Sequence, residues 1–390
     1  MLFRNVIYAL LLILLPVDAF GRGGVLNILY TGAINGELEP CGCSPETQSG
    51  GLARLSGFIS SNAEGLKPYI LVDAGNSFTE DSPQGRLKSE AILKSFVVMK
   101  YDAVALFSPG ASVRPDIAER LAGKDMPPVV SDMEGVGRSV RAGRGAFRVN
   151  ISVDRKGRKK GMLNILLTDR PVSEITGLDG WDAVITSSGE LLENPVKADG
   201  AIIAAGYPKG QKLGILTVEF DGKGESARFS NRWQPLGKDV KEDAGVRSVL
   251  REYDSKVSEL TKDADRNVLR QGAYLGASSC AQCHQPYNEI WKGTRHSNAF
   301  DSLDKAGKSR DPECVKCHTT GYGEEGGFYS KTATPGLAGV QCESCHGPGR
   351  AHVLDLRRMA PVGESACVRC HTESNSPMFN YEFYLERIKH

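Results

Sequence analysis

Histidine is absent from the first 283 of the 390 residues, and all seven histidines lie between His284 and His390. Eight of the ten cysteines fall in the same stretch, which leaves only Cys41 and Cys43 outside it. The formal net charge is +1, so the overall charge indicates neither nucleic acid nor membrane lipid as a partner. The confinement of cysteine and histidine to one end of the chain is therefore the informative feature.

Apolar runs long enough to cross a membrane are also lacking. The nearest candidate follows Arg4 and extends from Val6 to Leu15, about ten residues, which is short for a bilayer. Val17-Asp18-Ala19 then has the small-x-small form of a cleavage site, so we predict a signal peptide over residues 1–19. The mature protein would be exported, to the periplasm or the outer cell surface, with no membrane span. An uncleaved membrane anchor is the alternative.

Short apolar runs alternate with amphipathic stretches between residues 25 and 236, which predicts an α/β layered domain. A charged stretch with apolar residues at three- and four-residue steps follows, and it predicts a connecting helix within residues 240–270. The predicted strands cover 25–32, 69–75, 102–108, 163–168, 182–188, 199–206 and 212–221, and the predicted helices lie within 50–63, 89–100 and 113–122.

The C-terminal region, residues 271–390, lacks long apolar runs and is rich in glycine, charge, cysteine and histidine. About 120 residues with so few aliphatic side chains are too few to build an ordinary hydrophobic core. We therefore expect a mostly helical and irregular domain in which a bound group fills the interior.

Four copies of Cys-x-x-Cys-His identify that group. Two thiols three residues apart can each add across one haem vinyl group, and the next residue places its imidazole under the iron as the proximal ligand. Zinc knuckles and disulfides are the alternatives, but neither explains a histidine directly after every second cysteine. We predict four covalently bound c-type haems. The motifs are Cys280, Cys283 and His284; Cys314, Cys317 and His318; Cys342, Cys345 and His346; and Cys367, Cys370 and His371.

Three histidines remain once four serve as proximal ligands: His296, His352 and His390. They are candidate distal ligands, because imidazole is a common sixth ligand of haem iron in electron carriers. The Gly347-Pro348-Gly349 turn reverses the chain after the third motif, so His352 can face a different iron. Three distal ligands for four irons leave one open, unless a methionine such as Met359 or Met378 closes it.

The C-terminal region resembles the tetrahaem cytochrome family that includes the electron acceptor of hydroxylamine oxidoreductase. The resemblance rests on the four motifs, "RHSNAF", "CHTTGYG", "CESCHGPGRAH" and the closing "FNYEFYLERIKH". It implies bis-histidine haems with His296, His352 and His390 as distal ligands. It also implies one five-coordinate iron, on His318.

The N-terminal region resembles the calcineurin-like metallophosphoesterase domain of periplasmic nucleotidases, through "ILYTGAINGELEP", "GGLARLSGFI", "ILVDAGNSF" and "YDAVALFSPG". The family's metal ligands are missing. Ala33 and Asn35 replace an Asp and a His, Asn76 replaces the next Asp, and the Asn-His pair is lost around Ser108 and Pro109. The later His-x-His segment reads "AAGYPKG". Because a dinuclear site needs carboxylate and imidazole ligands, we predict the fold without its phosphoesterase chemistry.

The sequence thus predicts an exported multihaem c-type cytochrome that carries electrons between redox partner proteins, such as other multihaem cytochromes. The alternative is a redox enzyme that acts on a small nitrogen-oxide-type substrate at the open haem. The N-terminal domain would be a docking module or scaffold. Cys41 and Cys43 leave three possibilities open: a local disulfide, a metal pair or a partner contact.

Overall fold

The computed structural model describes residues 24–40, 48–79, 81–107, 126–134, 136–145, 147–221, 226–262, 272–359, 361–373 and 375–389. Several sequence predictions fall outside these residues. They are the signal peptide over 1–19, the Cys41 and Cys43 pair, the change around Ser108 and Pro109, the helix over 113–122, and His390.

The first of two six-stranded sheets has the order β12-β11-β1-β2-β3-β4. Strands β1 to β4 run parallel, and β11 pairs with β1 in the antiparallel sense before turning into β12. The strands are β1 (Gly24–Thr31), β2 (Tyr69–Asp73), β3 (Ala103–Leu106), β4 (Val129–Ser131), β11 (Lys212–Phe220) and β12 (Ser226–Pro235).

The second sheet has the order β5-β6-β7-β8-β10-β9, with four parallel central strands and an antiparallel strand at each edge. The strands are β5 (Ser139–Arg144), β6 (Phe147–Ser152), β7 (Leu163–Thr168), β8 (Ala183–Thr186), β9 (Val196–Ala198) and β10 (Ala201–Ala205).

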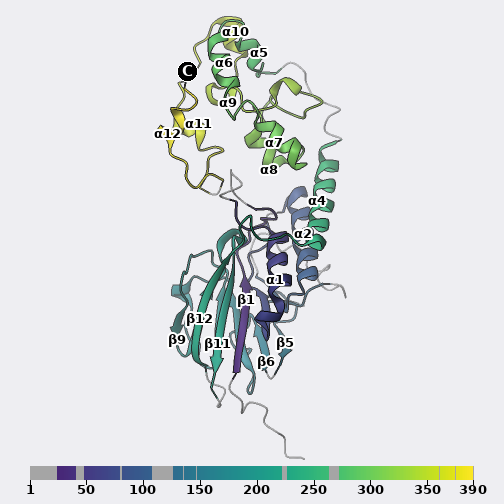
Figure 1. Ribbon diagram of the computed structural model, residues 1–390, viewed down its shortest axis with the longest axis vertical. Helices are drawn as coiled ribbons and strands as arrows, with labels where there is room; N and C mark the ends of the chain where they lie inside the picture. The colour runs from purple at the N-terminus through teal and green to yellow at the C-terminus, as the bar shows by residue number, and fades with distance from the viewer. Residues whose placement is uncertain are drawn as a thin grey trace, which may run out of the picture.

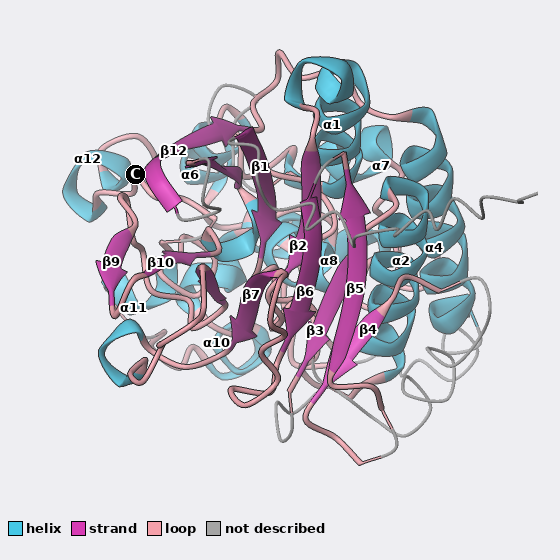
Figure 2. Ribbon diagram, turned by 90° about the horizontal axis from the view of Figure 1, so that it is seen from below, coloured by secondary structure: helices cyan, strands magenta, loops and turns pink. Residues whose placement is uncertain are grey.

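Three helices cover the outer face of the first sheet: α1 (Leu52–Leu66), α2 (Pro83–Met99) and α4 (Ala244–Lys262) (Figures 1 and 2). Successive residues of β1 show why its sequence is apolar throughout. Leu29 packs under the helices, whereas Ile28 and Tyr30 point into the core between the two sheets. Strands buried on both faces read as continuous apolar runs. The predicted α/β layered architecture is confirmed.

The C-terminal region consists of short helices joined by turns (Figure 1). Its described residues contain one small hydrophobic cluster, which is formed by Tyr274, Phe300, Leu303, Val315, Phe328 and Leu337. Its helices are α5 (Ala277–Cys280), α6 (Gln285–Lys292), α7 (Ala299–Ala306), α8 (Pro312–His318), α9 (Cys342–His346), α10 (Arg350–Asp355), α11 (Glu364–Cys367) and α12 (Tyr381–Leu385).

Side chains of the C-terminal region that usually seek burial lie at its surface. Leu356 is 83% exposed and Leu354 is 66% exposed, although both are large and aliphatic. As predicted, this region has little aliphatic core of its own. Within the described part of the chain, no helix is both long and apolar enough to cross a membrane.

Candidate haem-binding site

Each Cys-x-x-Cys-His motif lies on a short helix or the turn that ends it. The amide of His284 donates to the carbonyl of Cys280 at 2.9 Å, and the amide of His371 donates to that of Cys367 at the same distance. One helical turn places residues three and four apart on one face, so both thiols and the imidazole of a motif can face one bound group. All eight cysteines of the motifs are free thiols.

Thiols of different motifs lie against one another. Cys280 of the first motif forms a hydrogen bond with Cys342 of the third, and this bond with burial raises the pKa of Cys280. A hydrogen bond between Cys317 and Cys370 links the second motif to the fourth, and it lowers the pKa of Cys317 to about 7. Burial and the nearby Cys367 raise the pKa of Cys345, which links the third motif to the fourth. The four motifs therefore form one connected cluster.

Two pairs of histidines face each other at one characteristic distance. The ring centroids of His284 and His352 are 6.2 Å apart, and those of His296 and His371 are also 6.2 Å apart. An imidazole nitrogen binds a transition metal at about 2.1 Å and the ring centroid lies roughly 1.1 Å behind it, so two axial imidazoles have centroids about 6.4 Å apart. The separation of each pair is therefore close to that of two imidazoles bound to one metal ion.

The Nδ1 atoms of three histidines have hydrogen-bond partners that leave Nε2 available. His352 Nδ1 lies 2.8 Å from the carbonyl oxygen of Arg357, and His318 Nδ1 lies 2.8 Å from that of Ala299. A carbonyl can only accept, so both Nδ1 atoms carry the proton and both Nε2 lone pairs are free. His371 Nδ1 lies 3.2 Å from the Ser376 hydroxyl. This is the usual outer support of a metal-binding imidazole.

Burial keeps the buried imidazoles neutral, as metal binding requires. It lowers the pKa of His296, with a further contribution from neighbouring His371, and it lowers the pKa of His371 itself. Among the described residues, His318 has no ring contact with a second histidine. The distal assignments of His296, His352 and His390 remain predictions, and the thiol and imidazole set fits the haems that the motifs imply.

Glu343, inside the third motif, is a residue that sequence reasoning missed. Its side chain is buried, yet its carboxylate accepts backbone hydrogen bonds from Leu275, Gly276 and Gly349 at 2.6 to 3.0 Å. It therefore joins the segment before the first motif to the Gly-Pro-Gly turn after the third. A glutamate at a variable position of the motif has no sequence pattern that would indicate this role.

Three of the positions at which the sequence departs from the phosphoesterase pattern lie in tight turns of the N-terminal domain. Ala33, Asn35 and Asn76 all have left-handed backbones, with φ between 52° and 54°. The Asn76 side-chain amide donates to the carbonyl of Ser187 at 2.9 Å. In the described part of the chain, no group of three or more histidine, cysteine, aspartate or glutamate side chains is placed to hold a metal ion.

Asp73 at the end of β2 is the buried acid beside these turns. Burial raises its pKa to about 6. Hydrogen bonds that it accepts from Thr31, Ser77 and the amide of Gly75 oppose this rise, because they stabilise the charged carboxylate. Its side chain is fully buried, and its hydrogen bonds join the end of β1 to the turn over residues 75–77.

Residues 279–347 match the family described as cytochrome c554 and c-prime. The C-terminal region carries a cytochrome c554 domain. The matched residues include the first three motifs. Cytochrome c-554 of Nitrosomonas europaea is 31% identical over 121 residues, which cover 27% of this chain and 52% of that protein. The chain thus spans about half the length of this curated relative. The match supports covalent haem and electron transfer by the cytochrome c554 domain.

Solved structures are similar through the two-sheet domain. A 5'-nucleotidase precursor from Thermus thermophilus has a TM-score of 0.53 at 19% identity, covering 73% of this chain and 68% of that one. The NAD nucleotidase of Haemophilus influenzae has a TM-score of 0.50 at 12% identity, covering 66% and 64%. These likenesses confirm the predicted calcineurin-like phosphoesterase fold. The chain therefore joins that fold to a cytochrome c554 domain.

Proposed function

We propose that this protein is an exported tetrahaem electron carrier that passes electrons between redox partner proteins, such as other multihaem cytochromes. The observation that carries the proposal is the cluster of four Cys-x-x-Cys-His turns with two histidine pairs at 6.2 Å. Bound haem supplies the one-electron couple, and the chain contributes attachment, axial ligands, burial and spacing.

The thiol contacts support one order of the four sites. The first lies beside the third through Cys280 and Cys342, and the second lies beside the fourth through Cys317 and Cys370. Cys345 and Cys367 connect the third to the fourth. The path is therefore first, third, fourth, second, with the first and second sites at its ends, where partners can give and take electrons.

The histidine pairs assign two of the three predicted distal ligands. His352 serves the first site opposite His284, and His296 serves the fourth opposite His371. His390 is then the distal ligand for the third site, on His346. The second site, on His318, is five-coordinate. The open second site agrees with the resemblance described above, and His390 is assigned to the third site by elimination.

The N-terminal domain serves as a scaffold that holds the second site. Gln84 on α2 donates to Asp311 at 2.7 Å, and Lys88 pairs with Glu313 at 2.6 Å. Lys308 pairs with Asp254 on α4 and with Glu39 at 3.6 Å. All these contacts converge on residues 308–313, directly before Cys314 of the second motif. The scaffold thus fixes the helix that carries the end of the electron path.

Intact mass and a reduced-minus-oxidised spectrum test the proposal. Protein made in a host that matures c-type cytochromes should gain the mass of four haems and show low-spin c-type bands. A colourless protein, or one with only the mass of its amino acids, would require the C-terminal region to be interpreted again as metal knuckles.

A redox enzyme is the second candidate, because His318 has no facing imidazole among the described residues. An open iron could bind a small nitrogen oxide. Cyanide or nitric oxide should shift the spectrum of one haem. Turnover of hydroxylamine or nitrite would favour the enzyme, and its absence would favour electron transfer alone. Metal-dependent phosphatase activity should be nil.

A further inference from the structure

A strongly basic surface lies on the N-terminal domain, hidden by the near-neutral charge of the whole chain. Residues 138–162 contain nine lysines and arginines and one acid, Asp154. The segment therefore carries +8, and the rest of the chain carries −7 to give the total of +1. Such segregation creates a local field that the net charge does not reveal.

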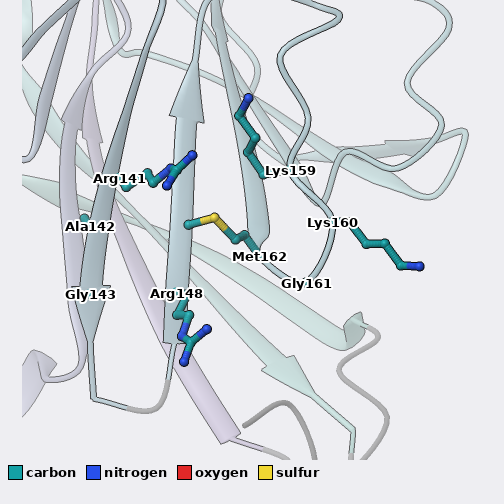
Figure 3. Close-up of a pocket in the computed structure, with 8 residues that line it drawn as sticks. All are labelled: Arg141, Ala142, Gly143, Arg148, Lys159, Lys160, Gly161 and Met162. Atoms are coloured by element: carbon teal, nitrogen blue, oxygen red, sulfur yellow. The ribbon is translucent and has the colours of Figure 1, made fainter. Parts of the chain in front are cut away.

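The basic segment borders a groove of about 540 Å³, which we call the basic groove. It is lined by Arg141, Arg148, Lys159 and Lys160 with Ala142, Gly143, Gly161 and Met162. Figure 3 shows Arg141, Arg148 and Lys159 around Met162, with Lys160 extending to the other side of the loop. No acidic residue lines the basic groove, and in the described part of the chain none of its four cations pairs with a carboxylate.

Strand register places Arg141 and Arg148 on the outer face of the second sheet. Arg148 of β6 lies opposite Gly143 of β5, so both face outward, while Ala142 and Val149 point into the core between the sheets. A Cβ atom on Gly143 or on Gly161 would meet nothing within 4 Å. The floor of the basic groove is therefore bare backbone, which a phosphate group can approach closely.

The basic groove lies at the end of the domain opposite the cytochrome c554 domain (Figure 1). Gly24 begins β1 beside Phe147, the neighbour of Arg148. Glu39, after the other end of β1, reaches Lys308 of the cytochrome c554 domain. The eight residues of β1 span about 26 Å at 3.3 Å each. A partner on the basic groove is thus remote from the haem attachment sites, so the groove anchors rather than exchanges electrons.

We propose that the basic groove binds the phosphate headgroups of an anionic lipid surface and holds the cytochrome c554 domain away from it. The four cations around the groove complement the phosphates of such a surface, and no acidic residue lines the groove to repel them. The position of the groove at the far end of the domain leaves the cytochrome c554 domain facing away from that surface.

Vesicle co-sedimentation of the haem-loaded protein tests this proposal. Vesicles with about one third phosphatidylglycerol should bind it, pure phosphatidylcholine vesicles should not, and salt should weaken the binding. Each cation at an anionic surface strengthens binding about fivefold, so Arg141→Gln with Lys159→Gln should weaken it about 25-fold. Lys197→Gln with Lys238→Gln, two exposed cations elsewhere on the domain, is the matched control and should change binding less than twofold.

Three results would overturn the proposal: equal binding to both kinds of vesicle, equal loss in the control, or displacement by millimolar inorganic phosphate. Binding of polyglutamate without binding of vesicles would also overturn it, and would assign the basic groove to an acidic protein partner. Unchanged far-ultraviolet circular dichroism and thermal unfolding of both double variants show that the N-terminal domain is folded. The outcome is independent of the haem number, so it is separate from the test of electron transfer.

Discussion

Replacing His352 by alanine should open one additional haem iron to small ligands. The His352 ring lies 6.2 Å from the His284 ring, close to the separation of about 6.4 Å expected for two imidazoles on one metal. The Arg357 carbonyl holds the His352 ring from its other side, through Nδ1. Alanine keeps the backbone of α10 and removes only the ligand, so the first site should become five-coordinate and high-spin.

Carbon monoxide titration of the reduced protein measures this change as a count. With the second site open, the unmodified protein should bind one carbon monoxide per four haems, and His352→Ala should bind two. His296→Ala should also bind two, because it frees the fourth site opposite His371 at the same 6.2 Å. The double variant should bind three. High-spin electron paramagnetic resonance signals should increase in the same ratio.

Tyr287→Phe is the matched control, because the Tyr287 ring lies 5.9 Å from that of His284 without offering an imidazole. It should bind one carbon monoxide. Intact mass must show the full haem number in every variant, so that loss of haem is not counted as loss of a ligand. If His352→Ala stays low-spin with one carbon monoxide bound, the pairing of His352 with His284 is wrong.

Three further substitutions test the structure around the site. Glu343→Gln should destabilise the haem-loaded protein by about 3 kcal/mol, because buried backbone amides lose a charged acceptor. Denaturant unfolding measures this change. Glu364→Gln, at an exposed glutamate, is the control and should have little effect. Lys88→Met should lower the free energy of unfolding by about 1–2 kcal/mol, a value between those of exposed and buried ion pairs. Because it removes a positive charge near the second motif, it should also lower the midpoint potential of the second haem alone. Lys94→Met is the control and should leave that potential unchanged, because its partners Glu90 and Glu252 are remote from the second motif. Burial raises the pKa of Asp73 from 3.8 to about 6, so the stability that its proton contributes is complete below pH 3.8 and is lost as the pH rises through 6. The difference in free energy of unfolding between the unmodified protein and Asp73→Asn should therefore fall by about 3 kcal/mol from pH 3.5 to pH 7. A difference that does not change with pH would refute the raised pKa.

Local sequence patterns predicted the strands whose side chains are apolar on both faces. The strand over 25–32 is apolar because both of its faces are buried, and β1 is found there. Strands β4, β5, β6, β9 and β12 were not predicted. In β5 and β12, arginines alternate with the apolar residues. In β12, Arg228 and Arg232 alternate with Phe229 and Trp233, which pack against the core from one side. A strand buried on one face has a weaker sequence pattern than one buried on two.

The features that the sequence could not predict depend on contacts between residues far apart in the chain. The motifs indicate four haem attachment sites, but the pairing of His284 with His352 joins residues 68 positions apart and depends on the fold. Glu343 accepts hydrogen bonds from amides far from its own motif in the sequence. The charge of the basic groove does not appear in the net charge of the chain, because acidic residues elsewhere offset it. Spacing in the sequence can indicate which groups a site contains, but only tertiary structure brings particular groups together.

The loop after β1 explains how a phosphoesterase fold serves a cytochrome. Ala33 and Asn35 give this loop two left-handed backbone positions. The same loop presents Glu39, whose carboxylate binds Arg247 of α4 through two hydrogen bonds of 2.7 and 3.0 Å. Glu39 also reaches Lys308, six residues before Cys314. This loop therefore links α4 to the segment before the second haem motif through the contacts of Glu39.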